Sequence, residues 1–297
     1  MHGLTLRVTK MHGLGNNYIY VNEFEEDLAE AELPALARRV SNVNTGIGSD
    51  GLILIGPSEQ ADFRMRIFNA DGSEGKNCGN GLRCVAKYVF ERKMTSQTSF
   101  TIETLGGLMK VVVHAPSHER DGDKVRVTNI TVDMGEPRFA RQHIPMVGDP
   151  DDTAIDVEVV IAGAPHRMTV VSMGNPHAVL FVPDVESIPL EAIGPQIECA
   201  PQFPERINVE FVSVRNEQEM DFRVWERGSG ITQACGTGAC AAVAAGVLNG
   251  LLKQDTPVTM HLPGGDLEIV WSASDSHIYM TGPATDVLDG EFRLDNE

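Results

Sequence analysis

Short runs of β-branched and aromatic residues, bounded by Gly, Asn and Asp, recur along the chain and predict a protein built mainly from β-strands. The first half contains YIYVN, GLILI, FRMRIFN, SFTIET and LMKVVVHA, and the second contains HRMTVVSM, HAVLFV, INVEFVSV, DFRVWE, PVTMHL and DLEIVWS. Helical spacing predicts helices over residues 33–41, 80–93 and 238–252. The last is apolar on every side, which is typical of a helix enclosed by its own domain. We therefore expect an α/β (α+β) fold in which a curled, mainly antiparallel sheet surrounds a central helix.

The two halves of the chain repeat the same motifs in the same order. NCGNGLRC and ACGTGAC place Cys78 and Cys235 157 positions apart, and LGNNYIYV and MGNPHAVLFV place Asn16 and Asn175 159 positions apart. FRMRIFN and FRVWE, GIGSDGLILI and RINVEFVSV, and two Gly-Gly pairs recur at 157 to 158 positions. Five matches at nearly one offset indicate a duplication. We expect two pseudo-symmetric domains, residues 1–133 with a C-terminal return at 282–297, and residues 134–281.

Composition limits the classes of function. The 297 residues carry a formal net charge of −18, which argues against nucleic-acid binding because a phosphate backbone requires a basic surface. The N-terminal segment lacks the apolar core and cleavage site of a signal peptide, and no apolar run approaches the roughly 18 residues of a membrane span. We expect a cytoplasmic protein that acts on a small molecule and binds neither nucleic acid nor membrane. A homodimer is compatible with the sequence, which does not fix the oligomeric state.

Cysteine usage points to reduced thiols. The odd count of five and the lack of an export signal argue against a disulfide framework, and the C-x5-C and C-x4-C spacings fit no metal knuckle, so we expect no metal site. Cys84 and Cys240 fall inside predicted helices and are assigned to packing, whereas Cys199 has no counterpart in the other half. Cys78 and Cys235 remain as candidate catalytic groups.

Cys78 and Cys235 each stand where a glycine-rich turn opens into a predicted helix. A single cysteine there is more often a small buried residue, but two at equivalent positions of a duplicated chain favour catalysis. The positive end of a helix stabilises a thiolate, so we expect both thiol pKa values to fall toward the working range. The same N–H groups can hold a carboxylate. Two facing thiols suit inversion of an amino-acid α-carbon without a cofactor, because one thiolate removes a proton while the other thiol donates one.

Six motifs together resemble the diaminopimelate epimerase family: MHGLGNNYIYVN, NTGIGSDG, FNADGSEGKNCGNGLRC, MGNPHAV, FPERINVEF and WERGSGITQACGTGACAA. The resemblance implies cofactor-independent interconversion of LL-diaminopimelate and meso-diaminopimelate in lysine and peptidoglycan-precursor biosynthesis, in a cleft between two domains. By motif position it gives the acid/base roles to Cys78 and Cys235 and a supporting role near the reacting amine to His177. It implies substrate contacts from Asn16, Asn69, Gly79, Asn80, Asn175, Asn208, Glu226, Arg227, Gly236 and Thr237.

Two departures from the family pattern concern the first half. Gly51 stands where some members carry Gln, so any contact from that side chain is missing. Gly-Lys-Asn precedes Cys78, which makes this approach more basic than in many relatives. Both leave the substrate contacts of the first half less defined than those of the second.

Three other functions stay open at this point. A proline or hydroxyproline racemase of the same fold fits CGTG, although those relatives typically carry His where this chain has Asn80, and Arg227 favours a substrate with a second amino-acid head. A thiol redox protein could cycle Cys78 and Cys235 through a disulfide, but the chain lacks a C-x-x-C motif. A binding protein without catalysis is disfavoured because both cysteines are retained.

Overall fold

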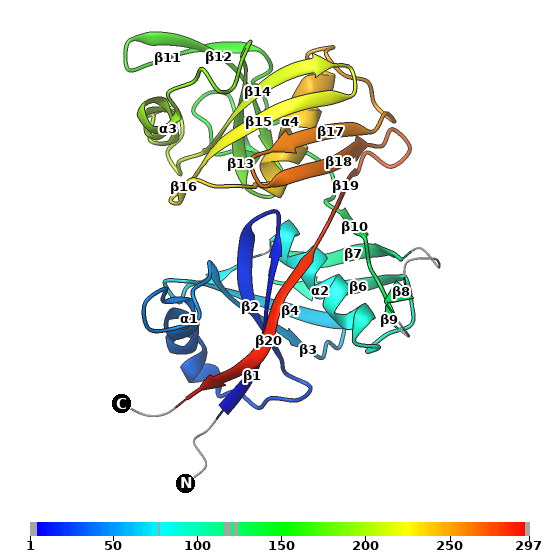
Figure 1. Cartoon of the computed structure of the whole chain (residues 1–297). Helices are drawn as coiled ribbons and strands as arrows, with labels where there is room; N and C mark the ends of the chain where they lie inside the picture. Colours follow the sequence, from blue (N-terminus) through cyan, green and yellow to red (C-terminus); the bar gives the residue numbers. More distant parts are fainter. Residues whose placement is uncertain (1–4, 77, 116–119, 122–123, 295–297) are drawn as a thin grey trace. The chain divides into compact units, whose positions relative to one another are not determined.

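Two compact units make up the chain. The computed structural model describes residues 5–76, 78–115, 120–121 and 124–294. Unit 1 comprises the described residues up to Val132 together with 282–294, and unit 2 comprises Asp133–Thr281. Each unit has its own strands and its own long helix, which Figure 1 colours along the sequence. Among the described residues, no helix is long and apolar enough to cross a membrane.

Unit 1 combines strands with two α-helices and one 3-10 helix. Its elements are β1 (Thr5–Gly13), β2 (Asn16–Asn22), η1 (Glu30–Glu32), α1 (Leu33–Ser41), β3 (Gly51–Gly56), β4 (Phe63–Asn69), β5 (Glu74–Gly75), α2 (Gly79–Glu91), β6 (Ser99–Thr104), β7 (Gly107–His114), β8 (Arg120–Asp121), β9 (Lys124–Val125), β10 (Asn129–Asp133) and β20 (Thr285–Arg293). β1 pairs antiparallel with β2, β2 parallel with β3, β3 antiparallel with β4 and β4 parallel with β6. β6 pairs antiparallel with β7, and the C-terminal strand β20 returns to pair with β1.

Unit 2 is built from the same kinds of element. They are η2 (Arg141–His143), β11 (Val157–Ile161), β12 (Ala164–Ser172), β13 (Pro176–Phe181), α3 (Leu190–Glu198), β14 (Asn208–Asn216), β15 (Glu219–Glu226), β16 (Gly230–Ile231), α4 (Gly236–Leu248), β17 (Val258–Leu262), β18 (Gly265–Trp271) and β19 (Ile278–Gly282). β12 pairs antiparallel with β13, β13 parallel with β14, β14 antiparallel with β15 and β15 parallel with β17. β17 then pairs antiparallel with β18, and β18 with β19.

One topology therefore occurs twice. In both units a parallel pair forms where a helix connects the two strands, since a parallel connection must cross over from one end of the sheet to the other. α1 and α2 make these connections in unit 1, and α3 and α4 make them in unit 2. The predicted fold class, two duplicated α/β halves with mainly antiparallel sheets, is confirmed.

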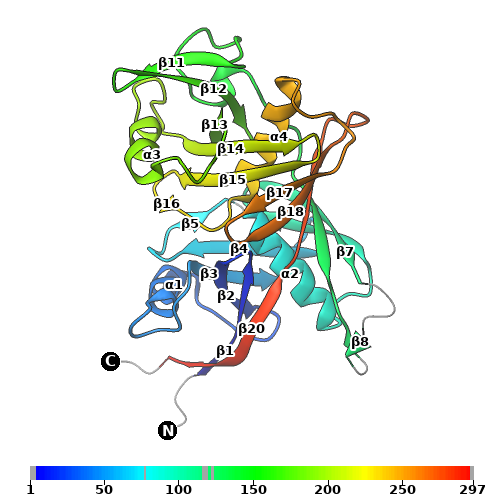
Figure 2. The ribbon, with the colours of Figure 1, turned by 45° about the horizontal axis from the view of Figure 1, so that its top comes forward.

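The second helix of each unit is enclosed by its sheet. α2 contacts β1, β2 and β7, and α4 contacts β12, β13, β14 and β18. Figure 2 shows α4 behind β14 and β15. Residues 79–89 of α2 and 238–246 of α4 are buried throughout. Because both helices are surrounded, each helix N-terminus ends inside its unit and can direct its N–H groups at a buried site.

The helices begin and end close to the predicted residues, with one omission. α1 spans residues 33–41 as predicted, whereas α2 starts one residue earlier than expected, and α4 starts two residues earlier and ends at Leu248. The unpredicted helix is α3, whose sequence LEAIGPQIE contains the helix breakers Gly194 and Pro195. Packing explains the glycine, because a Cβ there would lie 2.5 Å from Cγ of Trp225. Tertiary contact therefore overrides local propensity in α3.

Because α4 is enclosed, a charged substitution in it should lower the free energy of unfolding far more than the same substitution on an exposed helix face. Ala241 is fully buried, so Ala241→Glu places a carboxylate in an apolar interior and should lower the free energy of unfolding by about 3 kcal/mol or more. Ala35 lies on the exposed face of α1, and Ala35→Glu should change it by less than about 0.5 kcal/mol. Denaturant unfolding followed by circular dichroism measures both. Equal stabilities for the two variants would contradict an enclosed α4.

Candidate active site

Cys78 is the residue at which the chain enters α2. Its backbone is extended, with φ −150° and ψ 114°, and the side chain caps the helix because Sγ accepts a hydrogen bond from the Gly81 N–H at 3.4 Å. The thiol is half-buried. A cysteine at this position lies on the positive end of the helix, as the glycine-rich sequence predicts.

Asn16 and Asn80 lie next to the Cys78 thiol. Oδ1 of Asn16 accepts hydrogen bonds from Cys78 Sγ at 3.4 Å and from Asn80 Nδ2 at 3.3 Å. Nδ2 of Asn16 donates to Asp50 at 2.9 Å, which fixes the orientation of this amide. Arg83, one turn further along α2, donates to Asn80 Oδ1 at 2.9 Å. The structure thus brings both predicted asparagines to the first thiol.

The sequence analysis did not assign Asp50 and Arg83 to this site. Arg83 is fully buried in α2, and its Nε donates to the carbonyl of Pro283 at 3.1 Å. A lone arginine inside the apolar run GLRCVA was the available signal, because an arginine is almost never fully buried unless it is paired. Among the described residues, Asn69 does not join this hydrogen-bond network. Its Nδ2 donates to Ser73 in the turn after β4.

Cys235 holds the equivalent position at the start of α4. Its backbone is again extended, with φ −120° and ψ 102°, and only 5% of the residue is exposed. Unlike Cys78, its side chain makes no cap hydrogen bond to the helix, and Oγ1 of Thr237 lies 3.6 Å from its sulfur. The first-turn amides of Gly236 and Thr237 are groups that an α-helix does not use internally.

A chain of polar side chains connects Thr237 to a buried carboxylate. Asn175 Nδ2 donates to Thr237 Oγ1 at 3.2 Å, and Asn175 Oδ1 lies 3.0 Å from His177 Nε2. The other ring nitrogen, Nδ1, lies 2.7 Å from Oε1 of Glu210. His177 and Glu210 are both fully buried. Glu210 is another residue that the sequence analysis left unassigned.

Glu226 adds a second carboxylate beside the Cys235 thiol. Thr232 donates a hydrogen bond to its Oε1. Burial raises the pKa of the Glu226 carboxyl, although the Thr232 hydrogen bond and His177 oppose the shift. Glu226 can therefore accept a proton more readily than an exposed carboxylate.

The expected fall of the Cys235 pKa is not what the structure gives. Burial first, and then the negative charges of Glu226 and Glu210, raise the pKa of the Cys235 thiol well above its ordinary value. The Thr237 hydroxyl and the backbone at Gly238 lower the pKa and are outweighed. Desolvation of the thiolate exceeds the stabilisation by the helix terminus, because the sulfur is buried among acidic groups.

Asn208 binds the backbone just after β15, at Arg227. Asn208 Nδ2 donates to the carbonyl of Pro176 at 2.8 Å, and its Oδ1 accepts from the Arg227 N–H at 2.8 Å. The exposed guanidinium of Arg227 donates to the carbonyl of Glu205 at 3.1 Å. The buried Asn208 amide therefore ties β13 to the turn that presents the Arg227 side chain.

The remaining cysteines lie outside both sites. Cys84 and Cys240 are fully buried, and burial raises the pKa of Cys84 to about 12, so its thiol is unreactive near neutral pH. Cys199 is exposed. These environments agree with packing roles for the first two.

His177, Glu210 and Cys235 are also residue types that can bind a metal ion. Their ligand atoms lie within 4.8 Å of one another in the described part of the chain. Nδ1 and Nε2 of His177 are both engaged in hydrogen bonds, to Glu210 and Asn175. We therefore interpret the cluster as a hydrogen-bonded network.

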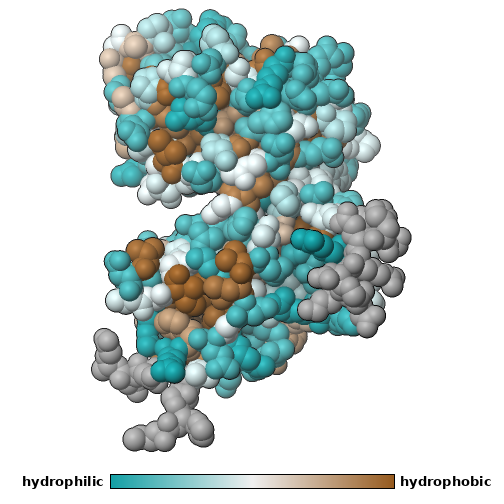
Figure 3. Space-filling model, viewed as in Figure 1, coloured by the Kyte–Doolittle hydropathy of each residue, from teal (hydrophilic) through white to brown (hydrophobic). Residues whose placement is uncertain are grey.

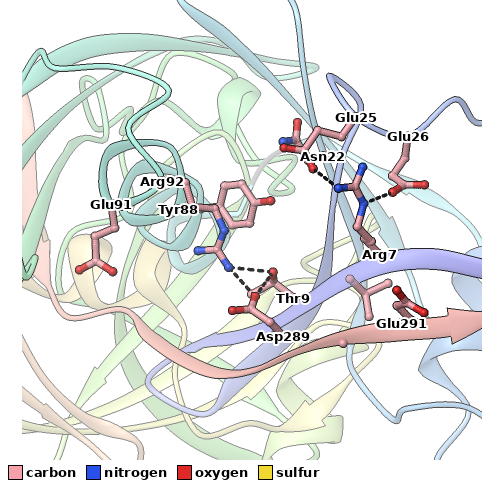
Figure 4. Close-up of a pocket in the computed structure, with 12 residues that line it drawn as sticks. Arg7, Thr9, Asn22, Glu25, Glu26, Tyr88, Glu91, Arg92, Asp289 and Glu291 are labelled. Carbon is pink, nitrogen blue, oxygen red and sulfur yellow. Dashed lines mark hydrogen bonds and ion pairs between the residues drawn. The ribbon is translucent and has the colours of Figure 1, made fainter. Parts of the chain in front are cut away.

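A separate cavity of about 760 Å³ in unit 1 is lined by none of the predicted site residues. Figure 4 shows both arginines of this cavity paired with carboxylates, Arg7 with Glu26 and Arg92 with Asp289. The Arg7–Glu26 contact is 2.7 Å long. Arg92 also stacks on Tyr88, with the guanidinium carbon 4.0 Å from the ring centre. The first pair joins β1 to the segment after β2, and the second joins the end of α2 to the returning strand β20, so both have a structural role.

Solved structures of other proteins share this fold. A hydroxyproline epimerase from Agrobacterium vitis superposes with a TM-score of 0.70 and 16% identity, covering 98% of this chain and 93% of the other. A phenazine biosynthesis protein of the PhzF family from Bacillus anthracis gives a TM-score of 0.68 at 17% identity, covering 98% and 100%. At these identities the likeness shows the shared fold alone.

Sequence similarity then identifies the family. The family model described as diaminopimelate epimerase matches residues 8–140 and 169–287. Diaminopimelate epimerases of Bacillus licheniformis and Bacillus subtilis are each 57% identical, covering 97% and 98% of this chain and 98% and 99% of the relatives. The chain belongs to the diaminopimelate epimerase family and is an isomerase.

The charge around Cys235 predicts the effect of removing Glu226. Glu226→Gln removes one of the charges that raise the pKa of the Cys235 thiol, so Cys235 should react faster with iodoacetamide at pH 8. Peptide mass mapping gives the rate at each cysteine, with exposed Cys199 as the reference. Glu226→Asp retains the charge and should leave the rate low. A slower or unchanged rate in Glu226→Gln would contradict this account of the pKa.

Proposed function

We propose that this protein interconverts LL-diaminopimelate and meso-diaminopimelate by a two-base mechanism without a cofactor, in lysine and peptidoglycan-precursor biosynthesis. The observation that carries the proposal is the pair of cysteines at equivalent helix starts, Cys78 at α2 and Cys235 at α4. Membership of the diaminopimelate epimerase family supports the choice of substrate.

In the proposed reaction the two thiols act on opposite faces of one α-carbon. The thiolate of one cysteine takes the α-proton and becomes a thiol, and the other thiol donates its proton to the opposite face and becomes a thiolate. Cys78 and Cys235 exchange these roles when the reaction runs in reverse. The net change is inversion of one centre, with no proton gained or lost.

Stabilisation of the carbanion is assigned to the two helix termini. An amino-acid α-proton is weakly acidic, so negative charge that develops toward the substrate carboxylate needs fixed positive dipoles. The amides at Gly79–Asn80 and Gly236–Thr237 are proposed to bind that carboxylate, because oriented N–H groups need no rearrangement during the reaction.

The second amino-acid group of diaminopimelate is proposed to bind polar residues around both helix starts. A guanidinium binds a carboxylate with two parallel hydrogen bonds, which suits exposed Arg227, and carboxamides supply both donors and acceptors. His177 and Glu226 are proposed to act near the reacting amine. The remaining proposed contacts are Asn16, Asn69, Asn175 and Asn208.

A proline-type racemase is the second candidate, and it is not favoured. The hydroxyproline epimerase shares the fold at 16% identity, whereas the diaminopimelate epimerases share 57% of this sequence. Proline has no second amino-acid head for Arg227 to bind. Exchange of the α-proton in D₂O, followed by NMR with each amino acid, separates the two candidates, and exchange with proline alone would overturn the proposal.

Loss of either thiol should abolish turnover. Cys78→Ala and Cys235→Ala each remove one of the two acid/base groups and should lower kcat/KM for diaminopimelate at least about 100-fold. Epimerisation is measured with purified protein and no added cofactor, by chiral separation of the isomers. Cys199→Ser, an exposed thiol outside both sites, should retain full activity. A normal rate in either alanine variant would refute the two-base mechanism.

We also propose a cytoplasmic homodimer, formed through the exposed edge of unit 1. β20 pairs with β1 among the described strands, and its Val287 and Leu288 side chains are 51% and 42% exposed. Figure 3 shows apolar side chains gathered on the face of unit 1 where β20 lies in Figure 1. An exposed apolar edge strand favours pairing with a second chain.

Leu288→Lys should convert the proposed dimer into a monomer, because it places a charge on the edge of β20. Sedimentation velocity at micromolar concentration measures the mass. Val147→Lys changes an apolar residue of unit 2 that is 59% exposed, and it should leave a dimer. A monomeric wild-type protein would rule out this part of the proposal.

A further inference from the structure

Glu210 is the most unusual titratable group in unit 2. It lies in the buried part of β14, and its side chain is fully buried. One carboxylate oxygen, Oε1, contacts Nδ1 of His177 at 2.7 Å, and the other, Oε2, has no hydrogen-bond partner among the described residues. Burial raises the pKa of Glu210, and His177 opposes that shift. The reaction as derived above gives this carboxylate no role.

The negative charge of buried Glu210 needs a compensating proton, and the Glu210–His177 pair is the place for it. Glu226 and the Cys235 thiol are the other titratable groups close to this pair, and both are neutral or negative. β12 and β18 also contact α4, but their charged side chains Arg167, Asp266 and Glu268 are exposed, and His166 lies in the β11–β12 hairpin. A buried carboxylate without a positive partner is costly, so Glu210 and His177 together must hold the compensating proton.

The hydrogen bonds beyond His177 all point in one direction. Nε2 faces the carbonyl oxygen of Asn175, so this nitrogen carries a hydrogen and donates. The Asn175 amide then donates from Nδ2 to Thr237 Oγ1. Because that oxygen already accepts a hydrogen bond, its own hydroxyl hydrogen is available for the Cys235 sulfur at 3.6 Å. Each group donates toward the thiol, which favours its thiolate.

We propose that Glu210 is a positioning residue for Cys235. With His177 it holds one proton that keeps Nε2 protonated, and this orients the Asn175 amide and the Thr237 hydroxyl so that both donate toward the Cys235 sulfur. The inference rests on the proposed function, in which Cys235 must ionise during every catalytic cycle. It provides the stabilisation that a thiolate buried beside Glu226 needs.

The first half shows the opposite arrangement at equivalent positions. Ile53, 157 positions before Glu210, replaces the carboxylate with an apolar side chain. Asn16, the counterpart of Asn175, has its Nδ2 held by Asp50 and therefore presents Oδ1 to Cys78, which donates to it. The network of unit 1 thus accepts from its thiol, whereas the network of unit 2 donates toward its thiol.

The glycines at the helix starts show that Glu210 is placed tightly. A Cβ on Gly238 would lie 2.7 Å from Oε1 of Glu210 and 3.2 Å from Cys235 Sγ. A Cβ on Gly81, the counterpart of Gly238, would lie 2.7 Å from Cδ1 of Ile53. The same space is therefore filled in both units, and only unit 2 fills it with a carboxylate.

Glu210→Gln tests the proposal, because glutamine has the shape of glutamate but cannot hold the proton on His177. We expect the ring to donate its Nδ1–H to the new carboxamide oxygen, which leaves Nε2 as an acceptor. Asn175 then turns over, and Thr237 donates to Asn175 instead of the sulfur. The pH at which iodoacetamide alkylates Cys235 should then rise, with about tenfold slower alkylation at pH 8. Cys78, in unit 1, should keep its pH dependence and serves as the internal control.

The direction of the change distinguishes this role from others. The charge of Glu210 by itself raises the pKa of the Cys235 thiol, so its removal alone would make Cys235 react faster, as expected for Glu226→Gln. The proposal requires the loss of hydrogen-bond donors toward the sulfur to outweigh that effect, and a purely structural role would leave the pH dependence unchanged. Either result for Glu210→Gln overturns the proposal.

Thr237→Val provides a second test if Glu210→Gln does not fold. It removes the last donor of the chain and should raise the alkylation pH of Cys235 by a similar amount, whereas Thr237→Ser should restore it. An unchanged pH in Thr237→Val would also overturn the proposal. Ile53→Val, at the equivalent apolar position of unit 1, controls for small packing changes and should leave both thiols unaffected. Alkylation requires no turnover, so this result is separate from a failure of the epimerase assay.

Discussion

A helix N-terminus inside a protein leaves N–H groups that the helix cannot satisfy, and this constraint organises both halves of the molecule. α2 and α4 are enclosed by their own sheets, so their first turns face buried polar groups and not bulk solvent. Glycine-rich turns bring the chain into each helix and leave room for a ligand beside the backbone. The cysteine at each N-cap is thereby placed where a carboxylate substrate can also be held.

The duplication places a cysteine at the start of an enclosed helix in each unit, but the two thiols have different surroundings. Cys78 is half-buried and donates to a carboxamide that Asp50 orients. Cys235 is buried among Glu210, Glu226 and His177, and burial together with the two carboxylates raises its pKa. A two-base epimerase needs one thiol and one thiolate at the start of each turnover. Different networks at the two sites are a direct way to hold the protons unequally.

Local and tertiary forces compete at several points of the fold. α3 contains Gly194 and Pro195, which disfavour a helix, yet the Trp225 ring packs where a larger residue would clash. The helix start at Cys235 should stabilise a thiolate, yet desolvation outweighs it. In both cases, contacts with residues distant in sequence decide the outcome.

The duplicated strand-rich fold, the enclosed helices and the position of both cysteines at helix starts can be predicted from the amino-acid sequence. Periodicity, glycine placement and a constant offset between repeats are local or repeated signals, so they can be recognised without coordinates. The folded arrangement was needed to show that Asp50, Arg83 and Glu210 join the thiol networks, and that Asn69 and Asn208 are bonded elsewhere. These residues come from separate strands and helices, and their hydrogen bonds, burial and mutual charge exist only once the sheets have closed around α2 and α4.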